Sequence, residues 1–172
     1  MTCWCISVFA AKRNRNRCET RRGSERVPFP EDLLEQANHL ARRDRNRPKQ
    51  ASLRRAISTA YYALFHLLVS AAVGYWRLKV QRPALARAFD HGKMKHASNG
   101  CNSADSDLQK VANAFVELQQ ARHLADYDGG KVWTRVESIY HIDLAKEAFS
   151  SWGPRPRPES SARLSSLHAG FA

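Results

Sequence analysis

Reactive side chains gather in one short stretch of the chain, residues 120–128 (QARHLADYD). Arg122 and Asp126 are four positions apart, so on a helix their side chains are neighbours and can form an ion pair. Such a pair would offset the cost of placing a guanidinium among apolar side chains. An arginine held in this way can bind a phosphate through two hydrogen bonds, with His123 or Tyr127 beside it for proton transfer or hydrogen bonding. The alternative is a structural pair that fixes the end of the helix to its neighbours.

A second set of polar side chains shares one face of the helix predicted after Pro48. The set offers a cation, a hydroxyl, a phenol and an imidazole: Arg55, Thr59, Tyr62 and His66. Intervals of three and four residues place these side chains along one stripe of a helix. The stripe is either a wall that faces RNA or a nucleotide, or a row of polar contacts between packed helices.

The sequence does not support other kinds of catalytic centre. None of the 7 histidines belongs to a Glu-x-x-His or His-Glu-x-x-His motif that would place metal ligands on one helix face. The 4 cysteines, at positions 3, 5, 18 and 101, show neither zinc-ligand spacing nor a disulfide framework. Glycine-rich phosphate loops and Gly-x-Ser-x-Gly elbows are also missing from the sequence. We therefore expect no metal and no cofactor, and we interpret His91 and His96 as exposed loop residues.

Two helices are predicted in the first half of the chain. The first begins at Pro30, with acidic residues in its first turn, and its apolar residues share one face as far as Ala41. The second restarts after Pro48 and can run to about Trp76, which is long for a globular protein. One broad face of this second helix is apolar: Leu53, Ile57, Ala60, Leu64, Leu67, Leu68 and Ala71. We expect it to be the central helix, covered on both sides by other helices or by a second subunit.

Three further helices are predicted in the second half of the chain. A short one spans residues 82–89, and a longer one starts within residues 103–107 and carries Arg122 on its apolar stripe. The last one starts near Thr134 and runs to Trp152. Its mostly helical spacing rests on the following positions: Val136, Ile139, Tyr140, Asp143, Leu144, Ala148 and Phe149.

These elements predict an all-α, single-domain protein, an up-and-down bundle of about five helices over residues 31–152. Both ends are predicted to be disordered: residues 1–30 as a basic arm, and residues 153–172 as a tail rich in Pro and Ser. The mildly apolar residues 2–11 are too short to span a bilayer and show no signal-peptide pattern. We therefore expect a cytoplasmic protein without a membrane segment.

The charge of the chain favours a polyanionic partner. It has 28 Lys and Arg against 16 Asp and Glu, a formal net charge of +12 at pH 7. Clustered cations of this kind bind nucleic acid or a membrane surface. Most of the excess lies in residues 1–26 and residues 42–55. The second stretch surrounds a predicted helix–helix turn, where it forms either a fixed basic surface or an ordinary solvated turn.

Three segments together resemble stand-alone bacterial HEPN-domain proteins. They are residues 51–66 (ASLRRAISTAYYALFH), 87–92 (RAFDHG) and 122–128 (RHLADYD), and the resemblance covers about residues 31–152. It implies an up-and-down helical bundle and frequent dimerisation, and hence a homodimer. The family includes metal-independent endoribonucleases, many of them toxins paired with a nucleotidyltransferase-like antitoxin.

The active-site pattern of that family is an Arg, a polar residue, three further residues and a His. Arg122 and His123 match the first two positions, whereas Tyr127 stands where the family has its final His. Cleaving RNA without a metal requires one group to take the 2′-hydroxyl proton and another to stabilise the charge on the phosphorus. An imidazole, with a pKa near 6.5, suits the first role better than a phenol with a pKa near 10.

The sequence leaves two functions open. In the first, a HEPN-like homodimer binds RNA or a nucleotide, with or without ribonuclease activity. Its groove is lined by the residues singled out above: Arg122, His123, Asp126, Tyr127, Tyr62 and His66, with Arg55 further along the stripe. In the second, the protein is a non-catalytic interaction module, the Arg–Asp pair is structural, and the partner is another protein, for example of the nucleotidyltransferase type.

Overall fold

The computed structural model describes residues 29–74, 78–101 and 105–153. Within these ranges the regular structure is entirely helical, which confirms the all-α prediction. The elements, in chain order, are α2 (Phe29–Arg42), α3 (Gln50–Gly74), the 3-10 helix η2 (Lys79–Gln81), α4 (Arg82–Arg87), α5 (His91–Asn99), α6 (Ser106–Tyr127) and α7 (Arg135–Trp152). The predicted disorder of the two ends falls on residues 1–28 and 154–172, outside the described residues. Helix α2 begins at Phe29, one residue before the predicted start at Pro30, so the basic arm assigned to residues 1–30 overlaps the helix by two residues.

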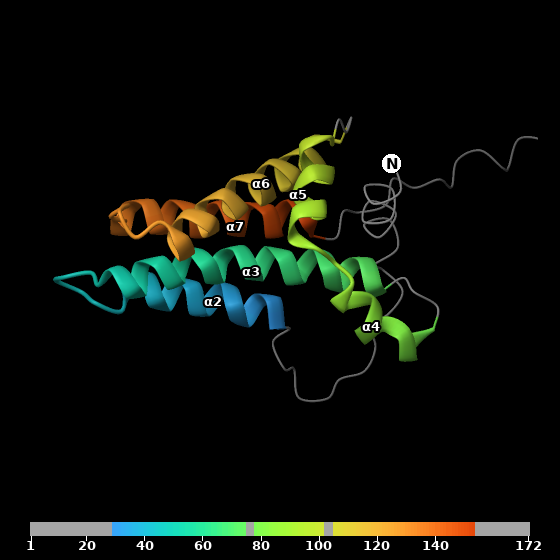
Figure 1. Ribbon diagram of the computed structural model, residues 1–172, viewed down its shortest axis with the longest axis horizontal. Coiled ribbons are helices and arrows are strands. Elements are labelled where there is room, and N and C mark those ends of the chain that lie inside the picture. Colours follow the sequence, from blue (N-terminus) through green and yellow to red (C-terminus); the bar gives the residue numbers. More distant parts are fainter. Residues whose placement is uncertain (1–28, 75–77, 102–104, 154–172) are drawn as a thin grey trace, which may run out of the picture.

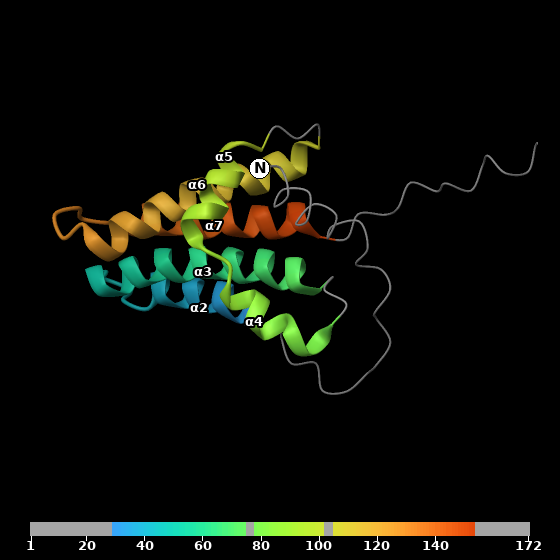
Figure 2. The same ribbon diagram turned by 45° about the vertical axis from the view of Figure 1, so that its right-hand side comes forward.

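Four long helices form the body of the molecule, with α3 in contact with the other three. α3 packs against α2, α6 and α7, and α6 and α7 also pack against each other. Short turns join α2 to α3 and α6 to α7, and both turns lie at the same end of the bundle (Figure 1). The chain between α3 and α6 forms α4, which contacts α3, and α5, which contacts α6 (Figure 2). The helical bundle is therefore confirmed.

The connection between α3 and α6 differs from the prediction. A single short helix over residues 82–89 was expected, followed by loop histidines, but the structure has the two helices α4 and α5. Asp90 caps α5, because its carboxylate accepts a hydrogen bond from the backbone N–H of Lys93 at 2.9 Å. This cap stabilises a helix start at His91 although Gly92 follows it. The interpretation of His91 and His96 as loop residues is therefore wrong.

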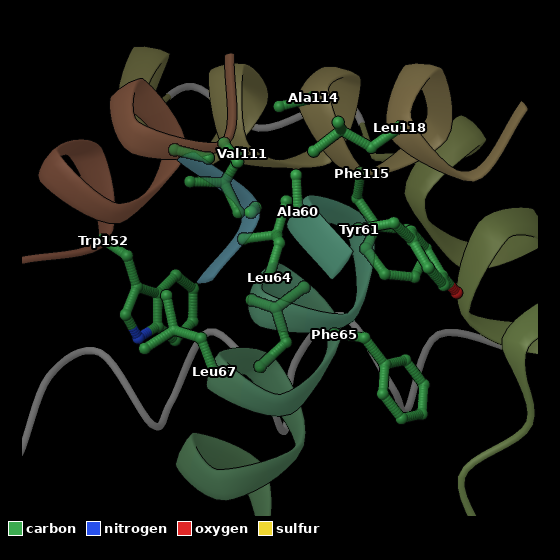
Figure 3. Packing of buried hydrophobic residues seen from close by; sticks show 14 of the residues in the cluster. Ala60, Tyr61, Leu64, Phe65, Leu67, Val111, Ala114, Phe115, Leu118 and Trp152 are labelled. Carbon is green, nitrogen blue, oxygen red and sulfur yellow. The ribbon is translucent and has the colours of Figure 1, made fainter. Parts of the chain in front are cut away.

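The hydrophobic core is centred on α3. Of its predicted apolar face, Ala71 alone is only half-buried. Figure 3 shows side chains of α3 meeting Phe115 and Leu118 of α6 and Trp152 of α7. By length and composition α3 could also cross a membrane, but most of its apolar stretch is buried inside the bundle. Burial of these side chains stabilises the fold by about 25 cal/mol for each Å² of apolar surface removed from water.

Helix α7 buries a face that is rotated from the predicted one, although Ala148 is buried and Ile139, Leu144 and Phe149 are partly buried against the core, as predicted. Val136 and Tyr140, expected on the apolar spacing, are 78% and 54% exposed, whereas Ser138 and Ile142 are fully buried. Trp133 explains the rotation, because it is buried just before the helix begins. It belongs to a second core cluster at the turn end of the bundle, formed by Leu53, Ile57, Ala121, Ala125 and Trp133. The predicted start of this helix near Thr134 is confirmed, and Thr134 is its N-cap, since its hydroxyl and the carboxylate of Glu137 form a capping box.

Arg54 holds the turn end of the bundle together. Its guanidinium donates to four backbone carbonyls: Ala125 at 2.9 Å, Asp128 at 2.8 Å, Gly129 at 3.5 Å and Lys131 at 2.5 Å. Some of these carbonyls lie at the C-terminal end of α6, where a helix leaves its acceptors unpaired. Arg135 makes a similar tie from α7, because it donates to the backbone carbonyl of Asp44 in the α2–α3 turn. Arg54 therefore serves the fold, although its position in the sequence suggested a cation of the basic surface.

We expect Arg54→Ala to lower the free energy of unfolding by about 1.5–3 kcal/mol, because several carbonyls lose a charged donor. The matched variant is Arg55→Ala, which removes an exposed neighbour and should change stability by no more than about 0.5 kcal/mol. Urea denaturation followed by circular dichroism measures both. Equal effects of the two substitutions would contradict this role of Arg54.

We also expect Phe115→Ala to destabilise the protein by about 3–5 kcal/mol, because a fully buried ring is replaced by a cavity. Val136→Ala should have almost no effect, since this side chain is exposed to solvent. The same denaturation experiment tests both variants. A large loss of stability in Val136→Ala would show that the rotation assigned to α7 is incorrect.

Candidate functional site

Arg122 and Asp126 form the predicted ion pair. The Nε atom of Arg122 lies 2.8 Å from Oδ2 of Asp126, one helical turn further along α6. The Nη2 atom of Arg122 donates to the hydroxyl of Tyr62 on α3 at 3.0 Å. The two charged side chains are 18% and 22% exposed, so the pair lies at the edge of the interior. It is neither sealed in the core nor freely solvated.

The carboxylate of Asp126 is held from both helices. Oδ2 faces Arg122, while Oδ1 accepts a hydrogen bond of 2.5 Å from the hydroxyl of Ser58, which is 1% exposed on α3. Asp126 therefore has a fixed orientation and in turn orients the guanidinium. Sequence reasoning missed Ser58, although its place one turn before Tyr62 on the same helix was a usable signal.

Three tyrosine rings surround the Arg122 guanidinium. The Cζ atom lies 5.9 Å from the ring centre of Tyr61, 5.5 Å from that of Tyr62 and 5.7 Å from that of Tyr127. At such distances the faces of the rings attract the cation. Burial alone would lower the pKa of Arg122, but the neighbouring phenols and the Asp126 carboxylate outweigh it and raise this pKa. The group is therefore a permanent cation.

One edge of this guanidinium remains open. Nε contacts the Asp126 carboxylate as an ion pair without an aligned hydrogen bond, and Nη2 donates to Tyr62, whereas Nη1 makes no hydrogen bond with a described residue. Nη1 is not a buried atom without a partner, so it is accessible to solvent. A guanidinium binds a phosphate or carboxylate most strongly through two parallel N–H groups. The free Nη1 and the second hydrogen of Nη2 can supply such a pair.

His91 is the main addition that the structure makes to the site. It is the first residue of α5, and its Nδ1 lies 2.6 Å from the hydroxyl of Tyr61. The imidazole packs 4.1 Å from the ring of Phe65 and 5.9 Å from that of Tyr62, measured between ring centres. Burial and the charge of Arg122 lower the pKa of His91 and outweigh the opposite effect of Asp90. His91 is therefore neutral at pH 7.

Tyr61 fixes which nitrogen of His91 carries the proton. This tyrosine is 0% exposed, and burial raises its pKa, so the hydroxyl stays protonated. Among the described residues, His91 Nδ1 is the one hydrogen-bond partner of the hydroxyl, which must donate to it to avoid an unpaired buried proton. The hydrogen of the neutral imidazole is then on Nε2. His91 thus carries an N–H donor close to the Arg122 cation.

His123 and Tyr127 lie on the outer side of α6. Both are exposed, Tyr127 to 68%, and their ring centres are 5.0 Å apart. Of the two, Tyr127 also contacts the Arg122 guanidinium. The pair forms an aromatic surface beside the cation, with no hydrogen bond that would commit the phenol to a partner within the described residues.

The other two predicted residues do not contact the Arg122 guanidinium in the part of the chain that the structure describes. His66 lies beside Tyr62, but its ring packs edge-on against Phe29 of α2 at 5.0 Å, and burial lowers its pKa. Arg55 is exposed nearer the start of α3. The structure thus brings Arg122 together with Asp126, Tyr62 and Tyr127, and leaves His66 and Arg55 at the margins.

The chain was compared with protein-family models, with curated proteins and with solved structures, and none of these comparisons gave a match. The chemistry of the site therefore follows from its own geometry. In the described ranges no group of three or more His, Cys, Asp or Glu side chains is placed to hold a metal ion. What the geometry offers is a fixed cation, a neutral N–H donor and exposed rings.

We expect the pKa of His91 to lie below about 6.5 and to rise in Arg122→Gln, because removing the nearby cation makes the imidazolium less unfavourable. Titration of the imidazole signals by NMR measures this pKa. Lys146→Gln, a change in an exposed cation of α7 paired with Asp143, is the control and should leave it unchanged. An unaltered His91 pKa in Arg122→Gln would contradict the proximity of the two groups.

Proposed function

We propose that this chain is a HEPN-like protein that binds the phosphate groups of RNA or of a nucleotide at Arg122. The single observation that carries the proposal is the open Nη1 edge of a guanidinium whose other nitrogens are fixed by Asp126 and Tyr62. The resemblance to HEPN-domain proteins supports it further, because its three segments contribute to one place. They supply Tyr62 from α3, His91 from α5 and Arg122 from α6.

In this proposal a phosphate oxygen accepts hydrogen bonds from Arg122. Little reorganisation is needed, since the guanidinium is already oriented by Asp126, which Ser58 holds in turn. The Nε2–H of His91 is a second donor for the same anion, and its neutrality avoids placing a second cation next to Arg122. A base can stack on the exposed ring of Tyr127. Fixed donors and an exposed ring together suit a nucleotide better than a simple inorganic anion.

Metal-independent ribonuclease activity would be an extension of this binding. In such a reaction the 2′-oxygen attacks phosphorus, the bond from phosphorus to the 5′-oxygen breaks, one group takes the 2′-hydroxyl proton and another returns a proton to the leaving oxygen. Arg122 would stabilise the charge on the phosphorane, and His123 is the exposed imidazole next to Tyr127. As in the resembled family, we propose a homodimer and a nucleotidyltransferase-like antitoxin as partners.

A second candidate function is a non-catalytic protein-interaction module. The observation that favours it is a row of exposed apolar side chains around the start of α7: Val132 at 71%, Val136 at 78% and Tyr140 at 54% exposure. Val136 and Tyr140, four residues apart, lie along one side of α7, and Val132 is exposed in the segment just before the helix. In this function the Arg122–Asp126 pair is structural, and the partner is another protein.

We expect Arg122→Gln to weaken the binding of labelled RNA about 10- to 100-fold, since hydrogen bonds to a charged group contribute about 1.5–3 kcal/mol. Arg122→Lys should be intermediate, because it keeps the charge but loses the planar fork. Fluorescence anisotropy in EDTA measures binding, and gel analysis of the same mixtures reveals any cleavage. Thermal unfolding of each variant provides the control for folding. RNA affinity that is equal in all three proteins, or absent in the wild type, would favour the interaction module.

A further inference from the structure

Exposed cations cover the turn end of the bundle, next to the Arg122 site. We call this set the basic end surface, and its members are Arg42, Arg43, Arg45, Arg47, Lys49 and Arg55, all of them exposed. No salt bridge or side-chain hydrogen bond engages any of these cations within the described ranges. Their charges are therefore available to an outside partner. Asp44 is the acidic residue within residues 42–55, and it contributes one negative charge against the six positive charges of this surface.

Hydrogen bonds fix the backbone of the α2–α3 turn, which carries most of the basic end surface. Asp44, in the middle of the α2–α3 turn, accepts hydrogen bonds from the hydroxyl of Ser52 at 2.7 Å and from the backbone N–H of Lys49 at 3.4 Å. Arg135 of α7 donates to the backbone carbonyl of the same aspartate. The turn is thus tied to two helices. Of the two interpretations open from the sequence, a fixed basic surface fits better than an ordinary solvated turn.

The basic end surface continues into the Arg122 site. Arg55 and Tyr62 lie on one face of α3, seven positions or about 10 Å apart, and the hydroxyl of Tyr62 is bonded to Arg122. Arg54, next to Arg55, is bonded to the C-terminal end of α6, the helix that carries Arg122. Figure 1 shows the α2–α3 and α6–α7 turns at this same end. The cations therefore follow one another from the Arg122 site to the α2–α3 turn.

A row of separate cations matches a chain of phosphates. A mononucleotide carries its phosphates at one end and could engage the Arg122 site but not the turn as well. A duplex keeps its bases stacked, whereas the exposed rings of Tyr127 and His123 offer a stacking surface to an unpaired base. A membrane surface is favoured less, because residues 42–55 include no exposed large apolar side chain that would insert into a bilayer and add to the charge attraction.

We propose that a single-stranded polynucleotide binds along the basic end surface, with one phosphate at Arg122, a base on Tyr127 and the following phosphates passing Arg55 toward the α2–α3 turn. The proposal rests on the proposed function for its first phosphate. It adds that the ligand is a strand several nucleotides long and that this strand runs from the Arg122 site toward the α2–α3 turn.

The experiment compares a labelled mononucleotide with unstructured single-stranded RNA of increasing length, over a range of salt concentrations. We expect affinity to rise with length and then to level off once the strand covers the surface. The variant Arg45→Glu/Arg47→Glu should lower the affinity for the longer RNA roughly 10- to 30-fold at 0.1 M salt and reduce the salt slope by about 1.4, the value for two lost phosphate contacts on a single strand. Its affinity for the mononucleotide should stay unchanged.

The matched control is Lys79→Glu/Arg87→Glu. It alters net charge by the same amount through two exposed cations of η2 and α4, at the other end of the bundle (Figure 1). We expect this control to bind RNA almost as the wild type does. Equal losses in the two double variants would overturn the proposal, because they would reduce the effect to overall charge. Equal affinity for a duplex of the same length would overturn the assignment of a single strand.

Failure of this inference can be told apart from failure of the proposed function. Mononucleotide binding that needs Arg122 but gains nothing from added length would overturn the strand path and leave the proposed function standing. RNA binding that depends on the turn but is unchanged in Arg122→Gln would overturn both. Binding to phosphatidylserine-containing vesicles without binding to RNA would also overturn both, since the anion would then be a lipid surface.

Discussion

A polar link between two buried helices is the constraint on which the site depends. The central helix α3 is packed on three others, so a polar side chain on its inner faces must find a partner there. The hydroxyl of Ser58 donates a hydrogen bond to Asp126, and the hydroxyl of Tyr62 accepts one from Arg122. Arg122 forms an ion pair with that same aspartate. The position of the cation is thus set by the packing of α3 against α6. A shift of either helix would break several of these contacts together.

The sequence predicted those parts of the fold whose signal is local and repeated. Apolar residues at helical spacing identified α2, α3 and α6, and the distance of four residues identified the pair of Arg122 and Asp126. Both signals depend only on the period of one helix, which holds whatever surrounds it. The start of α7 near Thr134 was also predicted correctly.

The predictions that failed depend on contacts between distant residues. The face that α7 buries depends on Trp133, which packs in a cluster with Ile57 and Ala121. The spacing of Val136 and Tyr140 does not indicate this contact. His91 was interpreted as an exposed loop residue. Its place in the site depends on Tyr61, thirty positions earlier in the chain. Neither relation can be read from a single helix period.

The bonding of Arg54 to the end of α6 has an electrostatic consequence for the neighbouring site. Aligned peptide groups give the C-terminal end of a helix about half a negative charge, and Tyr127 lies in that last turn, with Arg122 one turn earlier. An incoming anion would meet repulsion from those carbonyls. The guanidinium of Arg54 donates hydrogen bonds to carbonyls at this helix end, and its positive charge offsets their partial negative charge. One arginine thereby satisfies the end of α6 and reduces the repulsion that a negatively charged ligand would meet beside Arg122.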